Sequence, residues 1–126
     1  MILVLVALGG AAGASLRWWL GDVAPAGGGF PWTTFAINDS GCFAIACLPA
    51  AAVVHDRPAV AAGLGPGLLG GYTTMSAFAE ETRALLADDR VATAAAYVGG
   101  TLLLGLLAVV LAERLVGRLP TTVLEP

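Results

Sequence analysis

Residues 63–78 read GLGPGLLGGYTTMSAF, a stretch that lies in a long apolar segment and yet carries five glycines, Pro66 and the polar run Tyr72-Thr73-Thr74. Inside a helix each glycine costs about 1 kcal/mol relative to alanine, and a proline about 3 kcal/mol. Close helix packing through small residues could explain the glycines, but it explains the threonine hydroxyls less well. Backbone groups freed at membrane depth need partners, and broken helices there often mark ion or substrate sites. The stretch therefore predicts a broken membrane helix with a functional site at the break.

The whole chain has the composition of a membrane protein. Its 126 residues are 58% hydrophobic and 12% charged, with a mean hydropathy of +0.85. One bilayer span needs about 20 mostly apolar residues, so four spans with short loops use nearly the whole chain and leave no soluble catalytic domain. The sequence predicts an all-α membrane protein that is a single domain over residues 1–126, with four transmembrane helices at about 2–20, 32–54, 59–86 and 91–112.

Cysteine and histidine usage argues against metal clusters and enzyme chemistry. Cys42 and Cys47 lie five positions apart in an apolar run. On a helix they would point in different directions, which predicts neither a disulfide nor a metal pair. His55 is the single histidine, so no histidine cluster or triad can be assembled. We therefore expect a protein that is not an enzyme.

The first predicted span, residues 2–20, has an alternative interpretation as a secretory signal peptide with AGA as its cleavage site. It lacks the positively charged segment that such a peptide needs. Arg17 falls in its last turn, beside Trp18 and Trp19. The arginine either reaches the lipid headgroups in an interfacial aromatic belt or makes an ion pair inside the bundle.

Asn38 and Asp39 lie six and seven positions past Trp32, where the second predicted span begins. At about 1.5 Å per residue this is roughly 10 Å into the helix. An ionisable residue at such depth is rare and suggests a function. Arg17 is at a similar depth, so a structural Arg17–Asp39 ion pair is the alternative.

The fourth predicted span carries Tyr97, Thr101 and Gly105 at intervals of four, so these residues share one helical face. The two hydroxyls form either a hydrogen-bonded track or contacts between helices. Glu80, Glu81, Thr82 and Arg83 are most simply a solvated helix end.

The arginines give no preferred orientation in the membrane. With four spans, three arginines fall on or near each side: Arg57, Arg114 and Arg118 on one, and Arg17, Arg83 and Arg90 on the other. Since positive charge near the spans sets orientation, this balance is compatible with insertion both ways.

Four stretches, one in each predicted span, resemble the Fluc (CrcB) fluoride channel family. GGAAGASLRW at 9–18 resembles the family pattern GGxxGAxxRY, and FPWTTFAINDSG at 30–41 is similar to FPxGTLxVNxxG. GLLGGYTTMSAF at 67–78 resembles GxxGGxTTFSTF, and Tyr97 with Thr101 matches polar positions of the fourth helix.

The resemblance implies a multi-pass protein of the cell inner (plasma) membrane that exports fluoride passively and so lowers its toxicity. It implies an antiparallel, dual-topology dimer in the lipid bilayer, with two parallel pores and no nucleic-acid partner. A sodium ion would lie at the dimer centre, held by backbone carbonyls at Gly70 and Thr73. The positions that match the fluoride path are Asn38, Ser76, Phe78, Tyr97 and Thr101, and Arg17 and Glu81 match structural positions.

These residue types suit a small anion that gives up water reluctantly. The Asn38 amide and the hydroxyls of Ser76, Tyr97 and Thr101 are hydrogen-bond donors. The ring of Phe78 has a positive edge. The chain has no lysine, and a path without a fixed cation does not trap the anion, because conduction requires exit as well as entry.

The sequence departs from the family pattern at several places. Met75 stands where the first of two pore phenylalanines is expected, Ala77 replaces a threonine, Asp39 replaces an apolar residue and Thr33-Thr34 replaces Gly-Thr. Methionine is polarizable but has no positive ring edge. A homodimer would repeat these changes in both pores, whereas a heterodimer with a paralogous chain could supply what is missing.

Two other functions fit a small membrane protein of this kind. A four-helix, dual-topology multidrug exporter would need a buried carboxylate, usually a glutamate in the first span, and this chain has none there. A non-conducting partner subunit of a heterodimeric fluoride channel would tolerate the loss of a pore phenylalanine at Met75. The broken glycine-rich helix favours a conducting subunit.

Overall fold

The computed structural model describes residues 1–54 and 56–116, and the regular secondary structure of the described part is all helical. This confirms the predicted all-α class. His55 and the tail from residue 117, including Arg118, lie outside the described residues. The elements are α1 (Ile2–Val23), α2 (Trp32–Cys47), the short turns η1 (Leu48–Ala50) and η2 (Ala52–Val54), α3 (Pro58–Ala62), η3 (Gly63–Leu69), α4 (Gly70–Tyr72), α5 (Met75–Ala87) and α6 (Val91–Val116).

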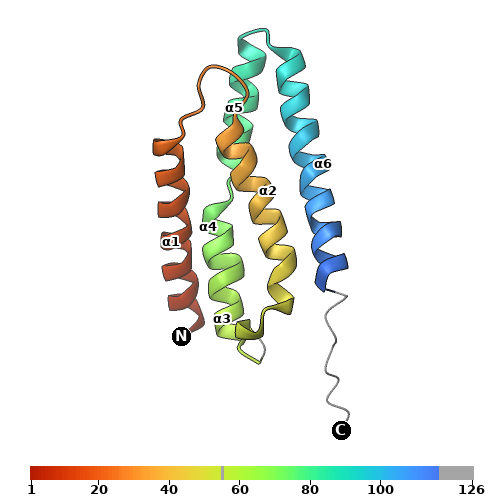
Figure 1. Cartoon of the computed structure of the whole chain (residues 1–126). Helices are drawn as coiled ribbons and strands as arrows, with labels where there is room; N and C mark the ends of the chain where they lie inside the picture. Colours follow the sequence, from red (N-terminus) through yellow and green to blue (C-terminus); the bar gives the residue numbers. More distant parts are fainter. Residues whose placement is uncertain (55, 117–126) are drawn as a thin grey trace.

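These elements form four helical columns that lie side by side (Figure 1). The columns are α1, α2, the segmented series from α3 to α5, and α6. Of the described helices, α1 and α6 are long and apolar enough to cross a membrane by themselves. The second column is shorter than the predicted span 32–54, because α2 ends at Cys47 and gives way to 3₁₀ turns at Pro49, which has no N–H for a helical hydrogen bond. The fourth is longer than predicted, since α6 continues to Val116.

The third column contains the predicted break, which lies at Thr73 and Thr74. Both residues have extended backbone, with ψ of 158° and 118°. Thr74 caps the following helix, and its Oγ1 accepts a hydrogen bond from the Ala77 N–H at 3.1 Å. Pro66 does not interrupt the helical backbone. It sits inside the π-helical segment η3, a wider turn that accommodates irregular hydrogen bonding.

Glycines allow α1 to touch the backbone of the third column. A Cβ atom at Gly13 would collide with the carbonyl oxygen of Leu68 and come within 2.8 Å of the Tyr72 nitrogen. Gly71 faces Gly10 of α1 in the same way, and its own Cβ would lie 3.0 Å from the Gly10 Cα. The small residues of the first and third columns thus serve the close packing of two helices.

We expect Gly13→Ala to lower the free energy of unfolding by about 1–3 kcal/mol, because the added methyl overpacks a backbone contact. Gly99→Ala in α6 is the matched control, since nothing lies within 4 Å of its Cβ position. It should raise stability by up to about 1 kcal/mol through helix propensity. Thermal unfolding of both variants in detergent checks this, and equal midpoints would contradict the packing argument.

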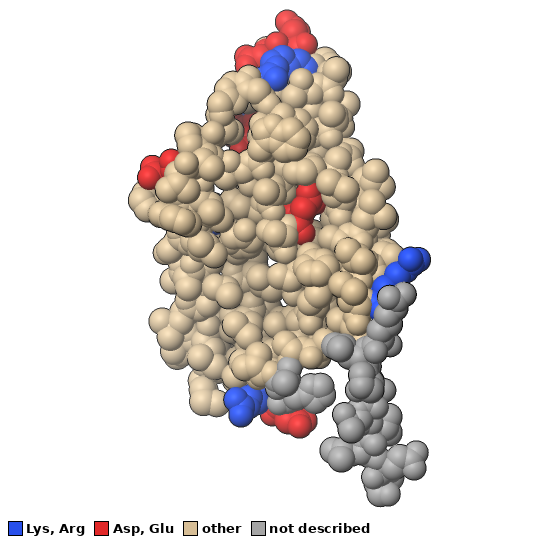
Figure 2. All heavy atoms as spheres, viewed as in Figure 1, with Lys and Arg blue, Asp and Glu red and all other residues tan. Residues whose placement is uncertain are grey.

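The surface suits a lipid environment. Long apolar side chains of α1 and α6 are exposed, among them Leu3, Leu8, Leu102 and Leu106. Most charged side chains gather at the two ends of the bundle, with carboxylates also visible nearer its middle (Figure 2). An apolar belt between charged ends is typical of a protein that sits in a bilayer.

Candidate functional site

The side chain of Asn38 in α2 forms hydrogen bonds with the extended backbone at the break in the third column. Its Nδ2 donates to the Thr74 carbonyl at 3.0 Å, and its Oδ1 accepts from the Thr74 N–H at 2.8 Å. One side-chain amide therefore satisfies both backbone groups of an extended residue, as a neighbouring β-strand would. Such partners are required where backbone leaves a helix away from water.

The break releases two carbonyl groups from helical hydrogen bonding. In a continuous helix the carbonyls of Gly70 and Thr73 would accept from the N–H groups of Thr74 and Ala77. Those N–H groups donate instead to Asn38 Oδ1 and Thr74 Oγ1. Gly70 is also exposed on the surface of the chain. The two residues that sequence reasoning assigned to sodium are thus among those at the break whose carbonyl oxygens lack their helical donors. The others are Gly71, whose carbonyl accepts from Arg17, and Tyr72.

A groove of about 490 Å³ runs along α2, the break, α5 and α6. It brings together four of the residues predicted for the fluoride path: Asn38, Met75, Phe78 and Thr101. Its wall is otherwise mainly apolar, and Met75 is 76% exposed. The lining residues are Asn38, Cys42, Ile45, Thr73, Thr74, Met75, Phe78, Thr101, Leu102, Gly105, Leu106 and Val109.

Ser76 and Tyr97 do not line this groove. Ser76 is exposed, and its Oγ lies 3.3 Å from the Thr74 hydroxyl. Tyr97 is fully buried, with its ring centroid 5.0 Å from that of Phe78. The predicted polar face of the fourth span is therefore divided: Thr101 faces the groove, whereas the Tyr97 hydroxyl joins helices.

Glu81 receives hydrogen bonds from two other helices. Thr34 Oγ1 of α2 donates to Oε1 at 2.7 Å, and the Tyr97 hydroxyl of α6 donates to Oε2 at 2.6 Å. The expectation of a solvated helix end is therefore wrong for Glu81, because this side of α5 faces α2 and α6. It holds for Glu80 and Arg83, which form an exposed ion pair at 2.6 Å.

Tyr97→Phe should lower the free energy of unfolding by about 1–3 kcal/mol, since a part-buried carboxylate oxygen of Glu81 loses its donor while the ring remains. Tyr72→Phe is the matched control. The Tyr72 hydroxyl makes an exposed contact of 3.1 Å with Ser40, so its loss should change stability by less than about 0.5 kcal/mol. Denaturation of both variants in detergent checks the difference. Equal destabilisation would show that the Tyr97–Glu81 hydrogen bond stabilises the fold no more than the exposed Tyr72–Ser40 contact.

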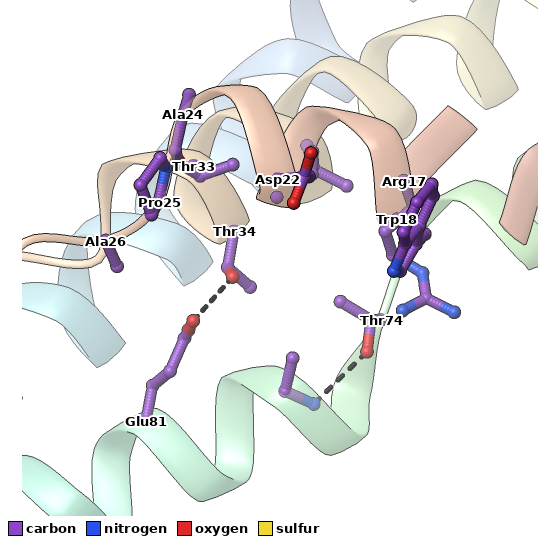
Figure 3. A pocket seen from close by; sticks show the side chains of 13 residues that line it. Arg17, Trp18, Asp22, Ala24, Pro25, Ala26, Thr33, Thr34, Thr74 and Glu81 are labelled. Carbon is purple, nitrogen blue, oxygen red and sulfur yellow. Dashed lines mark hydrogen bonds between the residues drawn. The ribbon is translucent and has the colours of Figure 1, made fainter. Parts of the chain in front are cut away.

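A cavity of about 440 Å³, with a more polar lining than the groove, leads from one end of the bundle toward the break. Figure 3 shows Glu81 reaching Thr34 across it, and Arg17 and Thr74 also line it. Thr74 lines both this cavity and the groove. The break is thus part of the wall of both.

Arg17 does not pair with Asp39 in the described structure. Its Nε donates to the Gly71 carbonyl at 3.2 Å, which ties α1 to the segment just before the break. The two carboxylate oxygens of Asp39 are buried, and among the described residues they have no hydrogen-bond partner. The alternative of an Arg17–Asp39 ion pair is therefore wrong. Sequence reasoning could compare their depths but not the helix faces on which they lie.

Comparison with known proteins gives a consistent family. Residues 4–113 match the family described as CrcB-like protein, Camphor Resistance (CrcB). A protein named fluoride-specific ion channel FluC 1 from Streptomyces coelicolor is 44% identical over 119 residues, which cover 88% of this chain and 74% of that protein. The FluC 1 protein of Thermobifida fusca is 44% identical over 122 residues (93% and 97%), and a FluC protein of Thermus thermophilus is 41% identical over 119 residues (92% and 95%).

Proposed function

The chain belongs to the CrcB family, and from this premise we propose that it is a subunit of a passive, fluoride-selective channel that lets fluoride leave the cytoplasm. The observation that carries the proposal is the groove in which Asn38, Phe78 and Thr101 meet beside the broken helix. The relatives compared above are named as ion channels.

The groove supplies hydrogen-bond donors that are free to meet an anion. Asn38 uses one amide hydrogen on the Thr74 carbonyl, and since the amide carries two, the second is available. Thr101 lines the groove, and its hydroxyl, which is buried in the single chain, has no partner among the described residues. It would reach the anion after a change of rotamer. Phe78 adds an apolar wall with a positive ring edge. A dehydrated fluoride ion would exchange its water for these groups without meeting a fixed cation that would hold it.

A second subunit would complete this site. The groove is open on one side, where Met75 is exposed, and Gly70 is exposed just before the break. An antiparallel partner would close the groove into a pore and bring two broken helices together. The released carbonyls of Gly70 and Thr73 would then face their counterparts and hold a sodium ion, a hard cation that prefers oxygen ligands. We place this dimer in the inner membrane, with multi-pass, dual-topology subunits.

The partner is either a second copy or a paralogous chain. In a homodimer Met75 occupies the first phenylalanine position of both subunits, so both pores are altered equally. In a heterodimer one pore could gather a complete set of rings from the other chain. The balanced arginines suit a chain that inserts both ways, and equally one whose orientation a partner sets.

Liposomes that contain this chain alone should release fluoride and retain chloride. Electrode recordings of both anions, with protein-free liposomes as the control, test the proposal. Equal passage of chloride would reject fluoride selectivity. Efflux that appears only when a paralogous four-helix chain is added would identify an obligate heterodimer, whereas full efflux from the single chain would exclude one.

A further inference from the structure

Three buried side-chain oxygens in the described part of the chain have no hydrogen-bond partner: both carboxylate oxygens of Asp39 and the Thr101 hydroxyl. An unpaired polar group away from water is costly, and an unpaired charge much more so. Asp39 also stands where the family resemblance leads one to expect an apolar residue. The fluoride path described above does not use its carboxyl group.

The packing of α2 on α6 places these oxygens in the same region. The two helices run side by side in the same direction (Figure 1). The Phe35 ring approaches Gly100, whose Cβ position lies 3.2 Å from Cε2, and one turn further on Asp39 Oδ1 lies 3.6 Å from the Cβ position of Gly105. Asp39 Oδ1 therefore lies at the level of Gly105, which is one helical turn beyond Thr101 on α6. Both of these α6 residues line the groove, so the carboxyl group lies just behind the groove wall.

No cation neutralises Asp39 among the described residues. The ionisable groups nearest to it along the packed elements are Cys42 of α2, Tyr97 of α6, Glu81 of α5, Tyr72 of α4 and Arg17 of α1. The other ionisable groups on these helices lie nearer the helix ends: Asp22, Cys47, Glu80, Arg83, Glu113 and Arg114. Tyr97 donates to Glu81, Tyr72 shares a contact with Ser40, and Arg17 donates to Gly71. The segments η1 and η3 carry no ionisable side chain.

A proton would remove the unpaired charge. A protonated carboxyl is neutral, so the cost of burying an unpaired charge disappears. We propose that Asp39 is a proton-binding site between α2 and α6, behind the groove wall, and that fluoride flux rises when Asp39 is protonated. This inference rests on the proposed channel function. It adds regulation of the fluoride flux by pH, through Asp39 of this chain.

The direction of the expected pH dependence follows from the repulsion between two negative charges, the ionised Asp39 carboxylate and the fluoride ion. As the pH falls, Asp39 becomes neutral and its repulsion of a fluoride ion in the groove is lost, so the flux increases. For two unit charges roughly 10 Å apart at an effective dielectric constant of about 20, this repulsion corresponds to about a tenfold difference in rate.

The experiment measures fluoride efflux from liposomes at about pH 5 and about pH 9, an interval wide enough to include carboxyls that titrate as high as about pH 8–9 when buried. Protein-free liposomes correct for permeation of hydrogen fluoride. Wild type should conduct about tenfold faster at the lower pH. Asp39→Asn and Asp39→Leu, which cannot ionise, should conduct at the fast rate at both values. Asp88→Asn, which removes an exposed carboxylate in the turn before α6, should behave as wild type.

Efflux that does not depend on pH in wild type, or that keeps its pH dependence in Asp39→Asn, would overturn the proton site and leave the channel function standing. No fluoride efflux under any condition would instead reject the channel function. The proton site is then tested on the wild-type protein by infrared spectroscopy. A protonated-carboxyl band that appears as the pH falls and is absent in Asp39→Asn supports the site, and its absence from wild type overturns it.

Discussion

Asn38→Asp is expected to abolish fluoride conduction, with a loss on the order of 10²-fold or more, as when a donor is removed from a charge-stabilising site. The asparagine amide donates to the Thr74 carbonyl and accepts from the Thr74 N–H. An aspartate keeps the acceptor and loses both donor hydrogens. It would place a carboxylate against the Thr74 carbonyl and present a negative charge to an approaching anion.

The measurement is fluoride efflux from liposomes, together with size-exclusion chromatography to establish that the variant still assembles. Ser40→Ala is the matched control on the same helix. Its hydroxyl is exposed and contacts the Ile37 carbonyl and the Tyr72 hydroxyl, so efflux should stay near the wild-type rate. Normal efflux from a well-assembled Asn38→Asp protein would show that the ion does not pass the Asn38 amide.

The sequence predicted the break in the third column because glycine, proline and threonine oppose a continuous apolar helix. It could not place the break. Pro66 lacks an N–H, yet it lies inside a π-helical segment and does not end the helix. The extended residues are Thr73 and Thr74, where the Asn38 side chain supplies the missing hydrogen bonds. Helix propensity depends on the local sequence, whereas Asn38, the hydrogen-bond partner of Thr74, lies on another helix, 36 positions away in the chain.

The same limit explains the errors at Glu81 and Arg17. Arg17 was judged by its depth along a helix, which follows from counting residues at about 1.5 Å each, and Glu81 by its place among charged residues near the end of a span. The partners of both depend on the rotation of each helix about its axis and on the pairing of columns. Glu81 turns toward Thr34 and Tyr97, and Arg17 toward Gly71. One clue was present, since two donors, Thr34 and Tyr97, lie in predicted membrane spans and need an acceptor.

Four of the residues predicted for the fluoride path line the same groove, because helical spacing and the neighbouring helices bring them to one side of α5. Met75 and Phe78 are three positions apart on α5, so they share a helical face. Asn38 and Thr101 come from the flanking helices, and each reaches the same groove. Ser76, one position after Met75, is turned away by the helical rotation of about 100° per residue. The structure thus separates lining residues from those that only neighbour them.

Phe78→Ile is expected to reduce fluoride efflux at least about tenfold, equal to about 1.4 kcal/mol of barrier, while the protein still assembles. Among the described residues that line the groove, Phe78 is the only aromatic one. Isoleucine fills a similar apolar position but has no positive ring edge to meet an anion. Met75 cannot replace that edge, because its thioether is polarizable without carrying it.

The substitution also removes an aromatic contact, since the Phe78 and Tyr97 ring centroids are 5.0 Å apart. This contact is worth about 0.5–1.5 kcal/mol, so the unfolding midpoint must be measured beside the flux. Phe43→Ile is the matched control, a half-buried phenylalanine of α2 that does not line the groove. A loss of stability in both variants with a loss of efflux only in Phe78→Ile would assign the ring to conduction. Normal efflux from Phe78→Ile would remove the ring from the fluoride path, and the selectivity of the groove would then rest on the Asn38 amide and the Thr101 hydroxyl.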